Sequence, residues 1–151
     1  PVEIVYLTEG SALKSLGKTS TKKDVKKAYD LTAEFPEIRT SFGFFISPPN
    51  ESARGFFEVL WFFIKGNLVL KYRNGGGVGL NWIRMEPGTR VYEIALREKM
   101  ITTETELLPE IADVRPDELY YCSPTVKKYD WIARSVLGLF EITRSVYRRI
   151  K

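Results

Sequence analysis

The segment that most constrains the fold is residues 56–98, where apolar runs alternate with turn-forming residues. The runs are FFEVLWFFI, LVLKYR, VGLNWIRM and TRVYEIALRE, and the turns are Gly66-Asn67, Gly75-Gly76-Gly77 and Glu86-Pro87-Gly88. β-Branched and aromatic runs separated by Gly, Pro and Asn are typical of strands joined by hairpins. The pattern predicts an antiparallel β-meander of four strands. The first run is also compatible with a buried helix, because an all-apolar run does not separate the two by periodicity.

Two segments outside this region have helical patterns. Thr21 and Asp24 form a capping-box pattern, and apolar residues at near-helical spacing continue to Pro36, which predicts a helix over residues 21–35. Ser123-Pro124 is typical of a helix start, and apolar residues then recur at spacings of three and four, which predicts a helix over 124–150. Residues 2–7 and 42–46 read as strands. Residues 104–114 read as a broken helix or exposed loop.

These elements predict one α+β domain over residues 1–151, an antiparallel β-meander packed by helices. A chain of 151 residues with 44% hydrophobic and 28% charged residues suits a soluble globular protein with one core. No stretch approaches 18 uncharged apolar residues, so no membrane contact is expected. A single cysteine permits no internal disulfide and suits a reducing compartment, which predicts a cytoplasmic location, the host cytoplasm for a viral protein.

The chain contains no histidine, which narrows the chemistry available to it. Ser-His and Cys-His nucleophilic pairs, imidazole general bases and His-ligated metal sites are excluded. Cys122 has no histidine or neighbouring base that would lower its pKa, so we expect it to be inert. Acid-base chemistry would have to come from carboxylates, lysines or tyrosines.

Basic residues are segregated along the chain. Residues 1–27, 67–99 and 124–151 carry net charges of +3, +3 and +5, and the intervening segments are acidic. If the fold brings the basic blocks together, they form a face that attracts nucleic acid without sequence preference. The expected DNA contacts on the final helix are Lys127, Lys128, Arg134, Arg144, Arg148 and Arg149. For the last three, complementing the helix dipole is the alternative role.

Glu86 is the main candidate for catalysis. It lies in a tight turn two residues after Arg84 and four before Arg90, and strand alternation would place Arg84 and Glu86 on one face. A carboxylate in this setting can bind Mg²⁺ or activate water while arginines stabilise the phosphate. Glu93 is the second candidate, since burial among its apolar neighbours would raise its pKa. The alternative for Glu86 is a turn residue paired with an arginine.

A loose Walker A pattern occupies residues 12–19, ALKSLGKT, between the predicted first strand and first helix. In such a loop Lys18 would contact phosphates and Thr19 would bind Mg²⁺. Bulky side chains fill the positions where glycine normally exposes backbone N–H groups. The alternative is a lysine-rich connection without a ligand.

The same region resembles the opening signature of the nucleotidyltransferase superfamily. Gly10-Ser11 after a strand and Asp24 match the positions of that signature, while Lys26 stands where its second metal-binding carboxylate belongs. The resemblance implies a remotely nucleotidyltransferase-like fold with an altered metal site. In its general character the chain also resembles small orphan proteins of filamentous archaeal viruses, some of which process DNA.

The sequence therefore predicts a DNA-binding nuclease that hydrolyses phosphodiester bonds of double-stranded DNA at Glu86, with Mg²⁺ as the expected cofactor. The alternatives are a non-catalytic nucleic-acid-binding viral protein and a nucleotide-binding protein using Lys18 and Thr19. Trp61, Trp82, Trp131 and the phenylalanines of residues 56–63 are expected to pack in the core rather than stack on bases.

Overall fold

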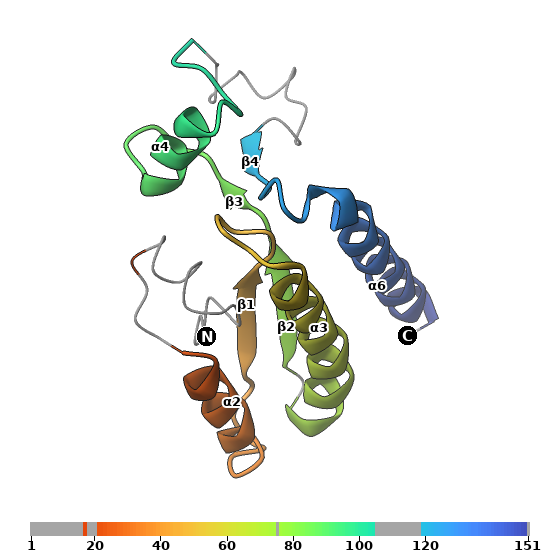
Figure 1. Cartoon of the computed structure of the whole chain (residues 1–151). Helices are drawn as coiled ribbons and strands as arrows, with labels where there is room; N and C mark the ends of the chain where they lie inside the picture. Colours follow the sequence, from red (N-terminus) through yellow and green to blue (C-terminus); the bar gives the residue numbers. More distant parts are fainter. Residues whose placement is uncertain (1–16, 18–20, 75, 105–118, 151) are drawn as a thin grey trace.

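A parallel β-α-β unit forms the centre of the fold (Figure 1). The computed structural model describes residues 17, 21–74, 76–104 and 119–150. Strand β1 (Ser41–Phe45) leads through a loop into helix α3 (Ala53–Asn74), and β2 (Gly77–Asn81) returns beside β1. The two strands are parallel, with Phe42 paired with Val78 and Phe44 with Leu80. The long helix between them is the crossover that parallel pairing requires.

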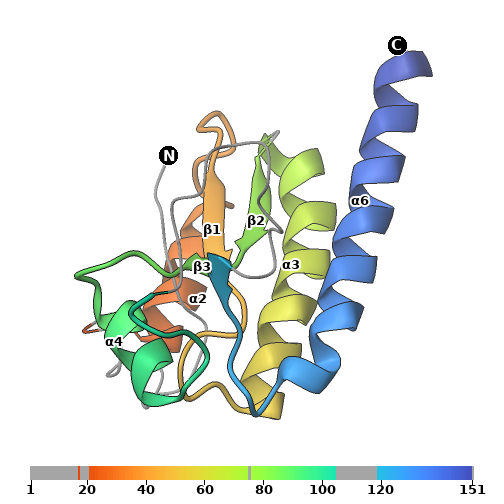
Figure 2. The same ribbon diagram turned by 90° about the horizontal axis from the view of Figure 1, so that it is seen from above.

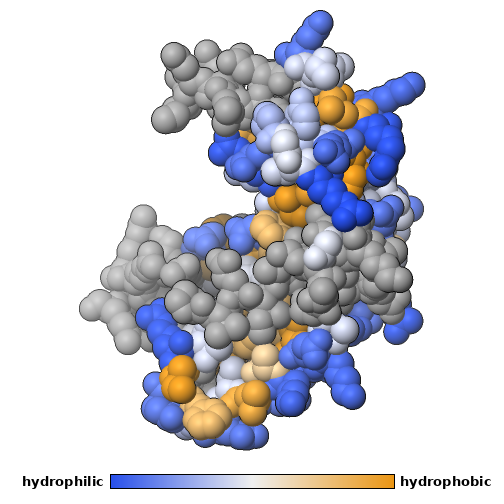
Figure 3. Space-filling view, turned by 90° about the vertical axis from the view of Figure 1, so that its left-hand side faces the viewer, coloured by the Kyte–Doolittle hydropathy of each residue, from blue (hydrophilic) through white to orange (hydrophobic). Residues whose placement is uncertain are grey.

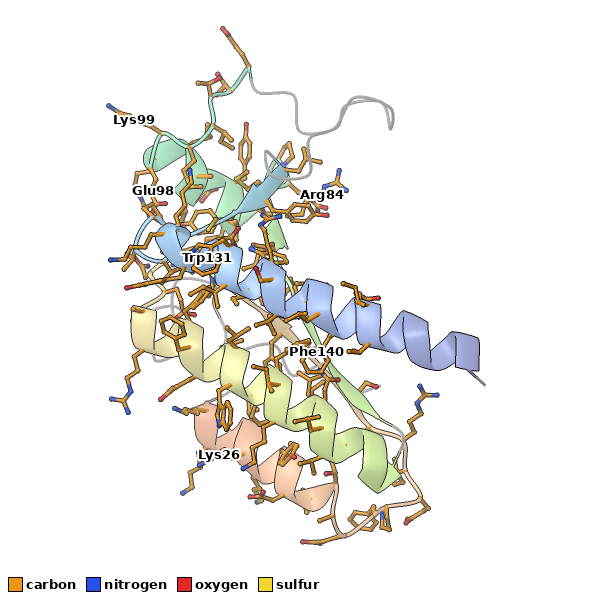
Figure 4. All side chains as sticks on the ribbon, turned by 90° about the vertical axis from the view of Figure 1, so that its right-hand side faces the viewer. Lys26, Arg84, Glu98, Lys99, Trp131 and Phe140 are labelled. Atoms are coloured by element: carbon orange, nitrogen blue, oxygen red, sulfur yellow. The ribbon has the colours of Figure 1, made fainter. Side chains whose placement is uncertain are left out.

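Helices cover one face of this two-stranded sheet. Phe42, Phe44, Val78 and Leu80 alternate toward that face and are buried. Helix α2 (Lys22–Leu31) and α3 pack there, and α6 (Asp130–Ile150) lies beside α3 (Figure 2). Phe140 points from α6 toward α3, where its ring centroid is 4.9 Å from that of Phe63 (Figure 4).

A smaller apolar cluster holds the other end of the molecule. Strand β3 (Ile83–Arg84) pairs antiparallel with β4 (Tyr120–Tyr121), and α4 (Arg90–Arg97) packs against them. The buried members of this cluster are Met85, Val91, Ile94, Ala95, Ile101, Leu119 and Tyr121. A short 3₁₀ turn, η1 (Lys127–Tyr129), then leads into α6.

The mixed helix-and-strand class predicted from the sequence is confirmed, as are its locally encoded elements. The capping box at the start of α2 is formed: the Thr21 N–H donates to Asp24 Oδ2 at 2.7 Å, and the Asp24 N–H donates to Thr21 Oγ1 at 3.3 Å. The Thr21 hydroxyl also donates to Asp24 Oδ2 at 2.7 Å, and this bond, followed by the one from the Thr21 N–H, lowers the pKa of the Asp24 carboxyl. The strand expected at 42–46 is β1, and the final helix is α6, which begins at Asp130 rather than at residue 124.

Helix α2 ends earlier than the sequence predicts. It stops at Leu31, and turns follow up to residue 38. Leu31, at the end of α2, and Phe35 and Ile38, in the turns after it, are exposed. Figure 3 shows apolar side chains gathered at the lower end of the molecule as seen from that side. The sequence predicts a helix that continues to residue 35 and is ended by Pro36, but the chain leaves the helical conformation after Leu31.

The predicted antiparallel meander is wrong. The first two expected strands and the Gly66-Asn67 turn are all part of α3, and the fourth expected strand is α4. Only the third run is extended, as β2 and β3, and β2 pairs in parallel with β1. The strand expected at residues 2–7 lies outside the described residues, as does nearly all of 104–114.

Helix α3 forms because its apolar residues have helical spacing once the whole run is considered. Phe56, Val59, Leu60, Phe63 and Leu70 are buried, whereas Arg54, Phe57, Trp61, Lys65 and Leu68 are exposed on the opposite side. Spacings of three and four on each side define two helical faces. The buried face of α3 belongs to the same apolar cluster as β1 and α6.

Helix α4 begins at a turn that the sequence indicates correctly. Glu86-Pro87-Gly88 is a turn, with φ of 80° at Gly88. Thr89 then caps a helix, because its Oγ1 accepts a hydrogen bond from the Tyr92 N–H at 3.3 Å. Val91, Ile94 and Ala95 face the small cluster at spacings of three and four. The turn therefore leads into a helix rather than into a strand.

No helix within residues 21–74, 76–104 or 119–150 combines the length and the apolar character needed to span a bilayer.

Gly66 permits the close approach of α3 to β2. A Cβ atom at this position would lie 2.5 Å from Val78 Cγ2, whereas a Cβ at Gly138 in α6 would have no neighbour within 4 Å. We expect Gly66→Ala to lower the free energy of unfolding by about 1–2 kcal/mol, because overpacking exceeds the gain in helix propensity. Gly138→Ala should raise it by about 1 kcal/mol. Urea unfolding measures both, and equal stabilisation by the two variants would contradict the packing.

Candidate nucleic-acid interface

Exposed cations and an exposed indole gather where α6 begins. We call Lys127, Lys128, Trp131 and Arg134 the α6 surface; all four are exposed, and Trp131 is 66% exposed. Trp131 and Arg134 are three residues apart on α6 and so lie on one side of the helix, while Lys127 and Lys128 belong to the η1 turn just before it. Lys128 Nζ lies 5.0 Å from the centroid of the Tyr129 ring.

A hydrogen-bond network fixes this helix start against the segment between β2 and β3. The Trp82 indole Nε1 donates to Asp130 Oδ1 at 2.7 Å, and the Arg134 guanidinium Nε donates to Asp130 Oδ2 at 2.6 Å. Arg134 Cζ also lies 4.8 Å from the centroid of the Trp82 ring, in cation–π distance. Arg134 is therefore held in place rather than free to swing through solvent.

The same network brings the α6 surface near the segment that carries Arg84 and Glu86. Arg84 is two residues after Trp82, and its Nε lies 3.9 Å from Glu86 Oε1. Both side chains are exposed; that of Glu86 is 57% accessible. The Glu86 carbonyl oxygen accepts hydrogen bonds from the Thr89 N–H and hydroxyl, which holds the turn. The structure thus brings together Arg84, at the end of β3, and Glu86, in the exposed turn that follows it.

Glu93 and Arg90 occupy the first turn of α4. Glu93 is exposed, so the predicted burial among its apolar neighbours is wrong. Arg90 is also exposed, and its Nη1 lies 3.9 Å from the place that a Cβ on Gly17 would occupy. Arg90 is therefore next to the one described residue of the Walker-like loop.

Several predicted site residues, or their side chains, lie outside the described part of the structure. Lys18 and Thr19 lie outside the described residues, as do Gly10 and Ser11 of the nucleotidyltransferase-like signature. The backbone of α6 includes Arg144, Arg148 and Arg149, but their side chains lie outside the described part of the structure. Asp24, the remaining member of that signature, is engaged in the capping box of α2.

Among the described residues, Glu86 does not belong to a cluster of metal-binding side chains. Within the part of the chain that the structure describes, no three acidic or thiol side chains lie close enough together to hold a metal ion. The described residues therefore do not form the multi-carboxylate site that two-metal hydrolysis uses. Glu86 with Arg84 can still bind one hydrated cation or orient a water molecule.

The N-terminus of α3 follows β1 in the β-α-β unit, but it is already occupied. Glu51 is buried there, and its Oε1 accepts a hydrogen bond from the Ser52 N–H at 2.9 Å. A Cβ on Gly55 would lie only 2.2 Å from the same oxygen. A buried carboxylate thus takes the place where a phosphate would bind in a dinucleotide site.

Two neighbouring side chains, Tyr121 of β4 and Cys122 after it, are held in their neutral forms. Burial raises the pKa of Cys122, whose Sγ lies 3.2 Å from Ser47 Oγ. Burial, and secondly the nearby Glu98 carboxylate, raise the pKa of Tyr121, whose hydroxyl donates to Glu98 Oε2 at 2.6 Å. Neither group supplies a nucleophile at neutral pH.

The expected packing role of the tryptophans is wrong for two of the three. Trp61 and Trp131 are 64% and 66% exposed, whereas Trp82 is half-buried. Of the phenylalanines in residues 56–63, Phe56 and Phe63 are buried as expected, Phe62 is half-buried, and Phe57 is exposed. Helical spacing could have revealed Trp61, since it lies seven residues after Arg54 and four before Lys65 on the outer side of α3.

Comparisons with known proteins give no relative: no protein family, no curated protein and no solved structure matches this chain.

Proposed function

We propose that the protein binds nucleic acid through the α6 surface. The observation that carries the proposal is the exposed indole of Trp131 set among Lys127, Lys128 and Arg134. Lysine and arginine neutralise backbone phosphates and release counterions, and an exposed indole can stack on an unpaired base. Asp130, the acid nearest these cations along the helix, is engaged by Trp82 and Arg134.

The binding should be independent of sequence and sensitive to salt. The cations of the α6 surface are exposed and lie where the helix starts. Contacts of this kind go to phosphates, which position a protein on a duplex without reading its bases. The nearby Arg84 extends the cationic area toward the Glu86 loop.

We expect the Lys127→Gln/Lys128→Gln double variant to bind a fluorescent 20-base-pair duplex more weakly than the wild type. The plot of log affinity against log salt should become less steep by about 2 in slope, since each lost phosphate contact reduces the magnitude of the slope by about 1. Fluorescence anisotropy at several salt concentrations measures this slope. Lys99→Gln, which removes an exposed charge beyond the end of α4, is the matched control. An unchanged slope in the double variant would overturn the proposal.

A second candidate function is hydrolysis of DNA at the Glu86 loop. Its specific support is the Arg84–Glu86 pair at 3.9 Å, which places a carboxylate and a phosphate-binding cation together in solvent. In this function Glu86 would orient water or one Mg²⁺ ion, and Arg84 would stabilise charge on the phosphate. The α6 surface would hold the duplex.

A further inference from the structure

A groove between α2 and α3 forms a separate surface from the one described above. Its volume is about 310 Å³, within the lower range of small-ligand sites. Lys22, Lys26, Tyr29 and Asp30 line it from α2, and Glu58, Trp61, Phe62, Lys65 and Gly66 line it from α3. Lys26 and Arg84 lie in different parts of the molecule, as Figure 4 shows.

The cations of the groove are unequal. Lys22 forms an ion pair with Glu58, and Arg54 Nε lies 3.2 Å from the other oxygen of that carboxylate. The hydrogen bond from Lys22 is the main reason that the pKa of Glu58 is lowered. In contrast, Lys26 and Lys65 are exposed and form no ion pair with another described residue. These two ammonium groups are the ones available to an anion.

The apolar part of the groove is aromatic and rigid. The Tyr29 and Phe62 rings pack edge to face with centroids 5.2 Å apart, and both rings also contact Phe42 in the core. Trp61 stands beside them with 64% of its surface exposed. An indole left in water next to two available ammonium groups is suited to a flat, aromatic and anionic ligand.

We infer that this groove binds one unpaired nucleotide unit, with its base stacked on Trp61 and its phosphate between Lys26 and Lys65. The inference rests on the proposed function, in that it makes single-stranded nucleic acid a ligand in addition to the duplex. Along α2, Lys26 also borders a second hollow, which Lys23 and Lys27 line together with Asp30 and Glu34, so a lining with more lysines than acids continues beyond the groove. That continuity favours a strand over a free nucleotide.

Asp30 allows the inference to be tested by a gain of affinity as well as by a loss. Its carboxylate lines the groove, where its negative charge would repel a phosphate. Asp30→Asn should therefore tighten binding of fluorescent oligothymidylate of 12 nucleotides about threefold, whereas Lys65→Gln should weaken it about threefold and reduce its salt dependence. Trp61→Ala should weaken it about tenfold, the loss expected for one stacked base.

The matched controls are Leu68→Ala, on the same outer side of α3 but not in the groove, and Lys99→Gln, far from Lys26 (Figure 4). Both should bind like the wild type. Thermal unfolding of each variant checks that the fold is retained. Deoxythymidine monophosphate as a competitor separates the two sources of the ligand: competition at micromolar concentration indicates a free nucleotide, and competition only at millimolar concentration indicates a strand.

The outcomes separate this inference from the proposed function. Oligothymidylate binding that is unaffected by the Trp61, Asp30 and Lys65 variants overturns the inference, while salt-sensitive duplex binding lost in the Lys127→Gln/Lys128→Gln variant keeps the proposed function. Binding of neither nucleic acid overturns both. Binding of vesicles containing phosphatidylserine, lost in Trp61→Ala while oligothymidylate does not bind, also overturns the inference, because it makes the groove a membrane contact.

Discussion

Asn67→Ala should lower the free energy of unfolding by about 2–4 kcal/mol, although the change favours helix formation. The Asn67 amide Nδ2 donates to the carbonyl oxygens of Phe63 at 3.0 Å and Val78 at 2.8 Å. Its Oδ1 accepts from the Val78 N–H at 2.9 Å. A side chain of α3 therefore pairs with the free edge of β2, opposite β1. Without it, the backbone polar groups of the buried Val78 lose their partners.

Urea unfolding and hydrogen exchange measure this effect. The unfolding midpoint should fall with little change in its denaturant dependence, and the Val78 amide should exchange faster. Asn67→Asp, which keeps the acceptor but loses the donor, should also destabilise the protein. Asn81→Ala is the matched control, since Asn81 is exposed at the end of β2 and its replacement should cost less than about 0.5 kcal/mol. A similar value for Asn67→Ala would show that the amide pairing does not stabilise the sheet.

Asn67 also shows why the meander was predicted wrongly. Gly-Asn between two apolar runs is a strong hairpin signal, but here each residue serves a tertiary contact within a helix. Gly66 lets α3 approach Val78, and Asn67 pairs with the backbone of the same residue. Gly66 and Asn67 both contact Val78 in β2, which lies eleven residues after Asn67 in the chain. Local turn rules cannot detect such a partner.

The elements that were predicted correctly contain their own signals. The capping box of α2 joins residues three apart, and the apolar stripe of α6 has helical spacing through most of its length. The strand β1 is short and bounded by the Pro48-Pro49 loop. Neither a distant partner nor a choice between parallel and antiparallel pairing is needed to recognise these elements.

The candidate sites also differ in whether residues near in sequence or residues far apart in the chain form them. The proximity of Arg84 and Glu86 follows from their separation of two residues, so the sequence could indicate it. The placement of Arg134 depends on Trp82, 52 residues earlier, through Asp130. The sequence does not reveal the groove between α2 and α3, because Trp61 falls in a predicted strand, whereas Trp61 and Lys65 in fact line the groove from helix α3.

For the second candidate function, Glu86→Gln should reduce the degradation of linear duplex DNA at least 100-fold, the usual contribution of a general base. The substitution preserves the size of the side chain but removes its charge, so it can neither activate water nor bind Mg²⁺. Since the Glu86 side chain is exposed and the hydrogen bonds of the turn go to its backbone carbonyl, stability should be unchanged. Agarose electrophoresis with Mg²⁺ or EDTA measures degradation, and anisotropy checks that duplex binding is retained.

Glu93→Gln is the competing variant in this assay, because Glu93 lies in the first turn of α4 with Arg90 and is also exposed. Loss of cleavage in Glu86→Gln alone assigns the chemistry to the loop after β3, and loss in Glu93→Gln alone moves it to the first turn of α4. Arg84→Gln should slow cleavage while lowering duplex affinity only slightly, since its guanidinium would act on the phosphate being attacked. Wild-type protein that binds duplex with Mg²⁺ and leaves it intact would rule out hydrolysis, and the α6 surface would then serve binding alone.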